Sequence, residues 1–207
     1  MGMKSGPVVV VLAAGHGSRY AGARHKLAEP WGERTVLGHT LHHAVSTGLP
    51  VMVVTTPAFA EEAARHIARK DVVVMGGVDG PPRGGMGDSI AAGVAARPSA
   101  AGWLMVPADM PMLLPATIRQ VAEALKRHAL AYAQVQGRRG HPVGFGGELY
   151  SDLVALTGDE GARRILARYP AHAVEVNDPG SLQDIDTLED HTRFHQLWRT
   201  QAGIAAA

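Results

Sequence analysis

The chain has 207 residues, a net charge of +1 with neutral histidines, and no cysteine. This length suits one α/β domain with a substantial core, so we expect a single domain over residues 1–207. The lack of cysteine excludes disulfides, thiolate metal sites and thiol catalysis, and it favours the cytoplasm. Lysines and arginines are spread along the chain, and the apolar run 8–14 is too short to span a bilayer. We therefore expect a cytoplasmic protein that binds neither nucleic acid nor a membrane.

Strand and helix patterns alternate through the first part of the chain. Continuous apolar runs predict buried parallel strands at residues 7–12, 51–55, 72–75 and 103–106. Helical patterns lie at residues 35–47, 58–69, 88–96 and 115–128. This alternation implies right-handed crossovers and an open, mostly parallel sheet with helices on both faces, as in Rossmann-like α/β folds.

The rhythm changes after His128. Short strand patterns at 131–136 and 141–145 predict a small hairpin, inserted around a turn at 137–140. A helix at 161–168, a strand at 173–176 and a final helix from about 187 to 196 follow, and the tail beyond Trp198 is expected to fray. We divide the domain into a main part of about 7–128, a hairpin part of about 129–186, and a C-terminal helix and tail, 187–207.

A loop of small residues follows the first strand directly. It consists of Leu12, Ala13, Ala14, Gly15, Gly17 and Ser18. Small residues let backbone N–H groups approach phosphate oxygens, and open α/β sheets bind ligands at this end of a strand. The loop lacks the third glycine of a dinucleotide fingerprint, and Ala23 stands where a Walker loop needs lysine. Arg19, Arg24 and Lys26 either converge on a triphosphate or are solvated surface charges.

Three carboxylates are candidate metal ligands. Asp109 follows an apolar strand and lies between two prolines, which suits a magnesium ligand at the sheet edge, although a turn or cap aspartate is the alternative. Asp184 and Asp186 flank Ile185, so extended backbone would place both acids on one side. Either could reach the metal, or one could cap the final helix, where Thr187 and Asp190 form a capping-box pattern.

Asp88 and Ser89 follow a second glycine loop, and N-capping of the next helix is the simple explanation for either residue. Among the histidines, His191 and His195 have i, i+4 spacing but lack the glutamate of a zincin motif. We expect that pair on an exposed face of the last helix. We expect His39, His42 and His43 on the solvent side of the first helix.

Several of these motifs together carry a family resemblance. The chain resembles nucleotidyltransferases with a MobA-like fold in the motif Leu12-Ala13-Ala14-Gly15-x-Gly17-x-Arg19, with Gly22 and Lys26. The resemblance extends to the segments 85–89, 107–111, 140–143, 158–163 and 184–190. The chain looks most like the cytidylyltransferases that act on molybdopterin, over nearly its whole length. One departure is Gly22, which follows the loop arginine one position later than the family usually has it.

The resemblance implies magnesium-dependent transfer of CMP from CTP to the terminal phosphate of molybdopterin or the molybdenum cofactor, with release of pyrophosphate. The catalytic residues it implies are Arg19, Lys26 and Asp109, and the metal ligands are Asp109 with Asp184 or Asp186. Nucleotide binding is assigned to Leu12, Ala13, Ala14, Gly15, Gly17, Ser18, Lys26, Gly87, Ser89 and Asp109. Acceptor contacts on the hairpin side are assigned to His141 and Arg163.

Other functions of the same sequence stay open. The preference for CTP over GTP rests on Ala14 and on the 107–111 motif, which look like those of the cytidylyl-transferring relatives. A sugar phosphate or phospholactate is an alternative acceptor. A protein from another class, a nucleotide-binding module that delivers cofactor without turnover, is disfavoured by the presence of Lys26 and Asp109. A molybdenum enzyme or its chaperone is the implied macromolecular partner.

Overall fold

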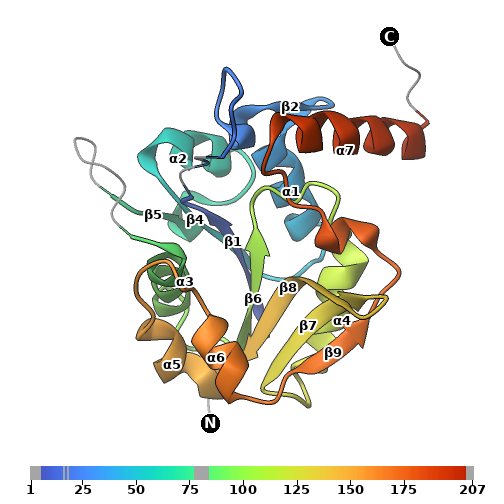
Figure 1. Cartoon of the computed structure of the whole chain (residues 1–207). Coiled ribbons are helices and arrows are strands. Elements are labelled where there is room, and N and C mark those ends of the chain that lie inside the picture. The colour runs from blue at the N-terminus through green and yellow to red at the C-terminus, as the bar shows by residue number, and fades with distance from the viewer. Residues whose placement is uncertain (1–5, 16, 18, 77–83, 204–207) are drawn as a thin grey trace.

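A single seven-stranded sheet forms the centre of the molecule, in the order β5-β4-β1-β6-β8-β7-β9 (Figure 1). The computed structural model describes residues 6–15, 17, 19–76 and 84–203. The strands are β1 (Val8–Ala13), β4 (Val51–Thr55), β5 (Val72–Val74), β6 (Gly102–Pro107), β7 (Leu130–Val135), β8 (Arg138–Gly146) and β9 (His172–Glu175). Among these strands, β8 alone runs antiparallel to its neighbours, β6 and β7. The predicted fold class, an open and mostly parallel sheet, is confirmed.

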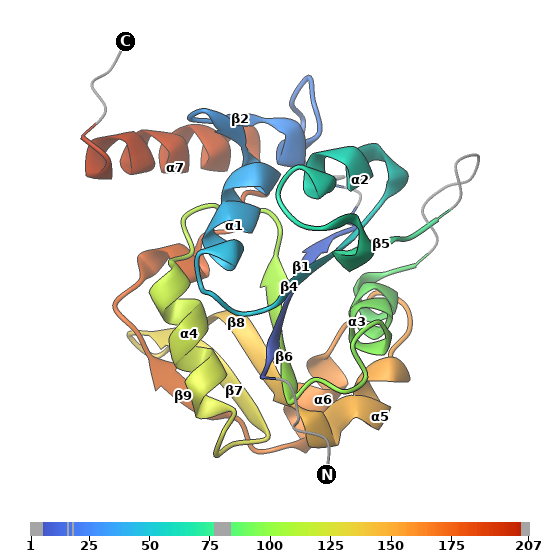
Figure 2. The same cartoon turned by 180° about the vertical axis from the view of Figure 1, so that it is seen from behind.

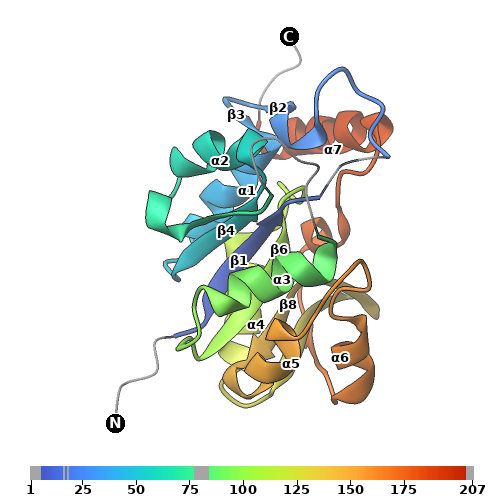
Figure 3. The ribbon, with the colours of Figure 1, turned by 90° about the vertical axis from the view of Figure 1, so that its left-hand side faces the viewer.

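Helices cover both faces of this sheet (Figures 2 and 3). One face carries α1 (Val36–Val45), α2 (Pro57–Ala64), α4 (Pro115–Ala124) and the C-terminal α7 (Leu188–Gln201). The other carries α3 (Met86–Ala95), α5 (Tyr150–Val154) and α6 (Arg163–Arg168). Alternate residues of β1 explain the two layers, because Val9 and Val11 enter the first core while Val8 and Val10 enter the second.

The predicted hairpin is present, but its turn is tighter than expected. Gln136 and Gly137 have positive φ angles of 49° and 78°, which suits a two-residue hairpin loop. Strand β8 therefore begins at Arg138, inside the predicted turn. The first half also contains an unpredicted small hairpin of β2 (Pro30–Trp31) and β3 (Arg34–Thr35). Strand β5 lies at the sheet edge, where Val74 is 47% exposed, so the prediction that this strand is buried was wrong.

Helix ends differ most from the predictions. Helix α4 ends four residues before the predicted residue 128, because Lys126 and Arg127 make i to i−3 backbone bonds that tighten the chain into a turn. Helix α2 likewise ends at Ala64 instead of residue 69. Helix α7 is longer than predicted and continues to Gln201, so the expected fraying beyond Trp198 was wrong up to that residue, and residues 204–207 lie outside the described residues. None of the described helices is long and apolar enough to cross a membrane.

A group of rings, which we call the Trp31 cluster, fastens α7 to the rest of the molecule. It comprises Trp31, His39, His191, His195 and Trp198. The Trp31 ring centroid lies 5.1 Å from that of His195 and 5.8 Å from that of Trp198. These contacts explain why α7 persists past Trp198, since aromatic packing stabilises its last turns.

The structure also places most histidines of α1 and α7 differently from the prediction. His39 is only 7% exposed and its ring lies 4.5 Å from that of His43, whose Nδ1 is 2.8 Å from the Leu113 carbonyl oxygen. Of the three histidines on α1, His42 is the one that is exposed. His191 and His195 face Trp31 instead of forming an exposed stripe. A helical spacing alone could not show that a late helix covers an early one.

Candidate active site

A cleft of about 540 Å³ lies at the carboxyl ends of β1 and β6, where open α/β sheets bind their ligands. The structure brings most of the predicted site residues to its wall. These are Leu12, Ala13, Ala14, Gly15, Gly17, Arg19, Lys26, Ser89, Asp109, His141, Arg163, Asp184 and Asp186. Segments from the start, middle and end of the chain therefore share one cavity.

Three predicted or candidate residues are not placed there. Ser18 falls outside the described residues. Arg24 is exposed and does not line the cleft, so the predicted convergence of three loop cations reduces to Arg19 and Lys26. Gly87 lies behind the cleft wall, where its N–H donates to the Gly158 carbonyl oxygen at 2.8 Å.

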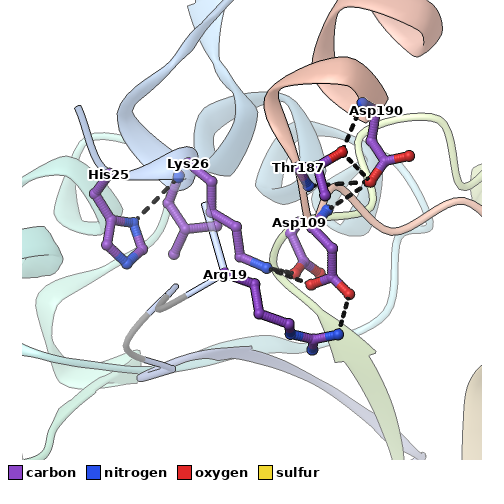
Figure 4. A network of polar contacts seen from close by, with 8 residues as sticks. Arg19, His25, Lys26, Asp109, Thr187 and Asp190 are labelled. Atoms are coloured by element: carbon purple, nitrogen blue, oxygen red, sulfur yellow. Dashed lines mark hydrogen bonds and ion pairs between the residues drawn. The ribbon is translucent and has the colours of Figure 1, made fainter. Parts of the chain in front are cut away.

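Ion pairs join the two sides of the cleft (Figure 4). Lys26 Nζ lies 2.5 Å from Asp109 Oδ2 and 3.2 Å from Asp186 Oδ1. Arg19 reaches the other oxygen of Asp186 at 2.7 Å. The Lys26 side chain is 12% exposed and that of Arg19 is 77% exposed, so Lys26 is not a solvated surface charge, whereas Arg19 can turn outward.

Local structure fixes Lys26 at the start of a short 3-10 helix, η1 (Lys26–Ala28). His25 caps this helix, because its Nδ1 accepts from the N–H of Leu27 at 3.2 Å. Leu27 is buried in the core and anchors the turn. The lysine side chain is therefore directed from a fixed base toward the carboxylates.

A backbone contact fixes the carboxylates. The N–H of Ile185 donates to the carbonyl oxygen of Asp109 at 3.0 Å, and Ile185 is fully buried. The two acids beside Ile185 thus lie next to Asp109. Neither of them caps α7, because Thr187 and Asp190 form the predicted capping box, with the Asp190 N–H donating to Thr187 Oγ1 at 3.1 Å.

The cap of α3 differs from the prediction. Its N-cap is Gly85, and Asp88 is the third residue of the helix, where its carboxylate accepts from the Gly85 N–H at 2.7 Å. Ser89 donates its hydroxyl to the Gly85 carbonyl oxygen at 3.2 Å. Neither predicted residue is therefore the N-cap itself.

Burial and charge set the protonation of the cleft. Burial lowers the pKa of Lys26, but the carboxylates of Asp109 and Asp186 outweigh it, so the pKa is raised and the ammonium is retained. Burial lowers the pKa of His141, against the opposing effect of Asp109 and Asp184. His141 is thus a neutral imidazole near pH 7 that can both donate and accept a hydrogen bond.

The residues present fit a hard divalent cation. Asp109 Oδ1 is buried without a hydrogen-bond partner among the described residues, and Asp184 makes no ion pair within the same part of the chain. Burial raises the pKa of Asp109 and the charge of Asp184 adds to this effect, against the opposing effect of Lys26. The described residues contain no preformed group of three metal-binding side chains. Two carboxylates completed by phosphate and water oxygens match the way magnesium is usually held.

Several residues of the cleft wall were not among the predicted site residues, and His25, Met86 and Asp159 are three of them. Met86 and Asp159 belong to glycine-bearing segments that carry the family resemblance, so the motifs held a signal for them. His25 adjoins Lys26 without any pattern of its own. Its place depends on η1, which is too short to give a periodic signal.

Known proteins resemble this chain over most of its length. The sequence profile described as the MobA-like NTP transferase domain matches residues 9–174. The bifunctional protein GlmU of Corynebacterium aurimucosum is 30% identical over 153 residues, which is 72% of this chain and 31% of that protein. The chain therefore spans about a third of the length of this curated relative.

Solved structures with the same fold cover nearly the whole chain. The Rv0371c protein of Mycobacterium tuberculosis, solved as a complex with manganese, superposes with a TM-score of 0.75 at 28% identity, covering 94% of this chain and 100% of that chain. A nucleotidyl transferase from Methanothermobacter gives a TM-score of 0.78 at 26% identity, covering 94% and 98%.

Proposed function

The chain belongs to the MobA-like NTP transferase family, and on that premise we propose that it transfers CMP from CTP to the terminal phosphate of molybdopterin. One observation carries the proposal. A basic pair, Arg19 and Lys26, and three carboxylates converge in one cleft beside a loop of small residues. Transfer between phosphate groups needs cationic side chains and carboxylates of this kind, which neutralise and position the phosphates.

The proposed reaction needs no general base. An oxygen of the acceptor phosphate attacks the α-phosphorus of CTP, and the bond to the β-phosphate breaks so that pyrophosphate leaves. A phosphate monoester has its second pKa at about 6, so this nucleophile is already anionic near neutrality. The protein must instead hold two phosphate groups in line and neutralise their repulsion.

Lys26, Arg19 and the backbone N–H groups of the small-residue loop can supply that neutralisation. Lys26 is fixed and nearly buried, so it suits the charge that builds on the phosphates. Arg19 is exposed and held in the described structure through Asp186, so it can turn to an arriving triphosphate. Asp109 and Asp184 would hold Mg²⁺, which supplies further positive charge to the phosphates when bound.

The choice of CTP rests on the resemblance and on one wall of the cleft. Ala14 lines the cleft and is only 8% exposed, so its methyl group limits the room above the loop. A smaller base is favoured there, although one methyl group discriminates by only about 1–3 kcal/mol. On the acceptor side, neutral His141 and cationic Arg163 can bind the pterin or its phosphate.

The deciding experiment is a matrix of four NTPs against molybdopterin, with pyrophosphate release as the readout. We expect CTP to be used with at least about tenfold higher kcat/KM than GTP, which corresponds to about 1.4 kcal/mol. A tenfold preference for GTP would reject the cytidylyl assignment. Release with a sugar phosphate or phospholactate but not with molybdopterin would reassign the acceptor, and no release with any pair would favour a delivery module.

Asp109→Asn tests the carboxylate. It preserves the shape of the side chain but removes the charge that a metal requires, so turnover should fall by at least about 100-fold, or about 3 kcal/mol. The matched control is Asp71→Asn, which breaks an ion pair with Arg97 away from the cleft and should leave kcat within about twofold. Near-normal turnover of Asp109→Asn with unchanged metal dependence would contradict the assignment.

A further inference from the structure

Two loops that are far apart in the sequence contact each other behind the cleft wall. The first, residues 84–89, includes the N-cap and the first turn of α3, and the second, residues 156–163, runs from the end of α5 to the first residue of α6. The Gly87 N–H donates to the Gly158 carbonyl oxygen, and a Cβ at Gly87 would lie 2.8 Å from the Thr157 carbonyl oxygen. A Cβ at Gly85 would overlap the Gly158 carbonyl group. The two backbones are therefore in direct contact, which glycine permits.

One carboxylate oxygen holds these loops together. Oδ2 of Asp88 accepts from the N–H of Gly85 at 2.7 Å and from the N–H of Gly158 at 2.8 Å. Those two backbone bonds lower the pKa of Asp88, so the carboxylate is ionised near neutrality. Hydrogen bonds to a charged acceptor are the stronger kind. Asp88 does more than cap its own helix, because Gly158 lies 70 residues away in the sequence.

Each loop also presents side chains to the cleft. The first contributes Met86 and Ser89, and the second contributes Asp159 and Arg163. Met86 packs over Gly161, where a Cβ would lie 2.9 Å from Met86 Cγ. Asp88 itself does not line the cleft. Its effect on a ligand must therefore pass through the loops it joins.

We propose that Asp88 is a positioning residue that couples the nucleotide side of the cleft to the acceptor side. Nucleotide bound against the first loop restrains Gly85. Because the Asp88 carboxylate accepts from both loops, this restraint extends to Gly158 and to the start of α6. Arg163 is then presented to the acceptor. The inference rests on the proposed function for the ligand that each loop binds. By linkage, the acceptor must tighten nucleotide binding by the same factor.

Three variants separate the two roles of Asp88. Asp88→Ala removes both bonds. Asp88→Glu retains the charge and can still cap Gly85 from the third helical position, but its longer side chain moves the oxygen away from Gly158. Asp88→Asn keeps an oxygen in place that can accept both N–H groups. The matched control is Asp152→Ala, which releases Arg168 and Tyr169, at the other end of α6, from α5 without touching the joined loops.

The experiment is amide hydrogen exchange of the full chain with and without CTP and MgCl2, in the absence of acceptor. In the wild type and in Asp88→Asn, nucleotide should slow exchange in both 84–95 and 156–166, by about threefold or more. In Asp88→Ala and Asp88→Glu, nucleotide should protect only the first segment. Asp152→Ala should behave as the wild type. Equal protection of 156–166 in all variants would overturn the proposal.

The same data distinguish a failure of the proposed function. If neither CTP nor any other NTP protects either segment of the wild type, nucleotide binding at this cleft is wrong. The role of Asp88 is then still decided in the ligand-free chain, where Asp88→Ala and Asp88→Glu must speed exchange in 156–163 by about tenfold. Unchanged exchange there would overturn the inference. Because Asp88→Glu keeps the helix cap, it decides the matter even if Asp88→Ala does not fold.

Discussion

Lys26 lies beside the carboxylates that we propose as metal ligands. Its ammonium lies 2.5 Å from Asp109 Oδ2 and also neutralises Asp186, so in this structure the carboxylates already have a cation. Carboxylates this close together need one, because their mutual repulsion in a partly buried cleft is costly. The proposed metal would bind the other oxygen of Asp109 together with Asp184, so it would compete with the adjacent ammonium for the negative charge of the Asp109 carboxylate.

Lys26→Met tests this competition. The variant keeps the length of the side chain and removes its charge, so Mn²⁺ should bind the nucleotide-free chain about tenfold more tightly, a gain of about 1.4 kcal/mol. Turnover should nevertheless fall by at least about 100-fold, since the cation that stabilises the phosphates is lost. Titration calorimetry with MnCl2 gives the first quantity. Lys26→Arg is the control, because it keeps the charge and should not tighten metal binding. Unchanged Mn²⁺ affinity in Lys26→Met would remove the basis of the competition.

The sequence predicted which residues belong to this ion-pair network better than it predicted which of them pair with each other. The resemblance implied that Asp184 or Asp186 joins Asp109, and the structure brings both acids to the cleft, but alternation around Ile185 left open which one was engaged. The structure separates them, because Asp186 pairs with Lys26 and Arg19 while Asp184 makes no ion pair in the described residues. Lys26 and Asp186 lie 160 residues apart, and a local pattern carries no information on such a contact.

At the scale of elements, the docking of α7 determines where the carboxylate segment lies. Helix α7 begins two residues after Asp186, and the Trp31 cluster fixes the helix against β2 and α1. Gly32 is central to this contact. It has a φ of +60°, and a Cβ there would lie 2.5 Å from the Trp198 ring.

Gly32→Ala should destabilise the protein for two separable reasons. A positive φ disfavours alanine by about 1–2 kcal/mol, and the overlap with Trp198 should add about 1–3 kcal/mol. Gly48→Ala is the matched control that reports the backbone effect alone, because Gly48 has a φ of +74° and a Cβ there would meet no described atom within 4 Å beyond its chain neighbours. Urea unfolding gives both free energies. In a Trp198→Ala background the difference between the two glycine variants should disappear, and its persistence would show that the ring contact is not responsible.

Elements with a strong hydrophobic period were predicted to within a few residues. Short elements, and element ends that depend on distant parts of the chain, were not. The 51–55 strand matches β4, and the predicted 7–12 and 103–106 strands overlap β1 and β6. Helix α5 was missed because its five residues make little more than one helical turn, and the β2–β3 hairpin was missed because its strands have only two residues each. The end of α7 depends on aromatic contacts from another part of the chain, which a local pattern does not contain.

At the scale of the whole molecule, buried histidines should make stability depend on pH. Burial lowers the pKa of His39 from 6.5 to about 3, and the charges of His43, Arg34 and His42 add to the effect. Between those values the unfolded chain binds a proton that the folded chain does not. Stability contributed by neutral His39 is therefore present above about pH 6.5 and is lost as the pH falls toward about 3.

His39→Gln removes this titration. The free energy of unfolding, measured with urea between pH 7 and pH 4, should fall less steeply in the variant than in the wild type. His42→Gln is the control on the same helix, since His42 is exposed and its replacement should change the slope less. Parallel slopes for wild type and His39→Gln would show that other groups govern the acid sensitivity.

The fold class was predictable as a whole because alternating strands and helices leave few arrangements. Strand order was harder. The hairpin was expected as an insertion, but β8 in fact lies between β6 and β7 inside the main sheet, so residues 102–107 and 138–146 pair directly. A hairpin pattern says that two strands pair with each other and does not say which third strand they join.

The reversed direction of β8 has a consequence for how this scaffold can change. Because β8 runs against β6, its early residue His141 reaches the ligand edge of the sheet, while the turn at Gln136 and Gly137 stays in solvent. The Lys26–Asp109 pair and the small-residue loop lie on other segments of the chain, so substitutions at the start of β8 alter one wall of the cleft without replacing them. If the proposed function holds, the start of β8 is the place for directed evolution, where libraries would be selected for new acceptors while the proposed nucleotide side is kept.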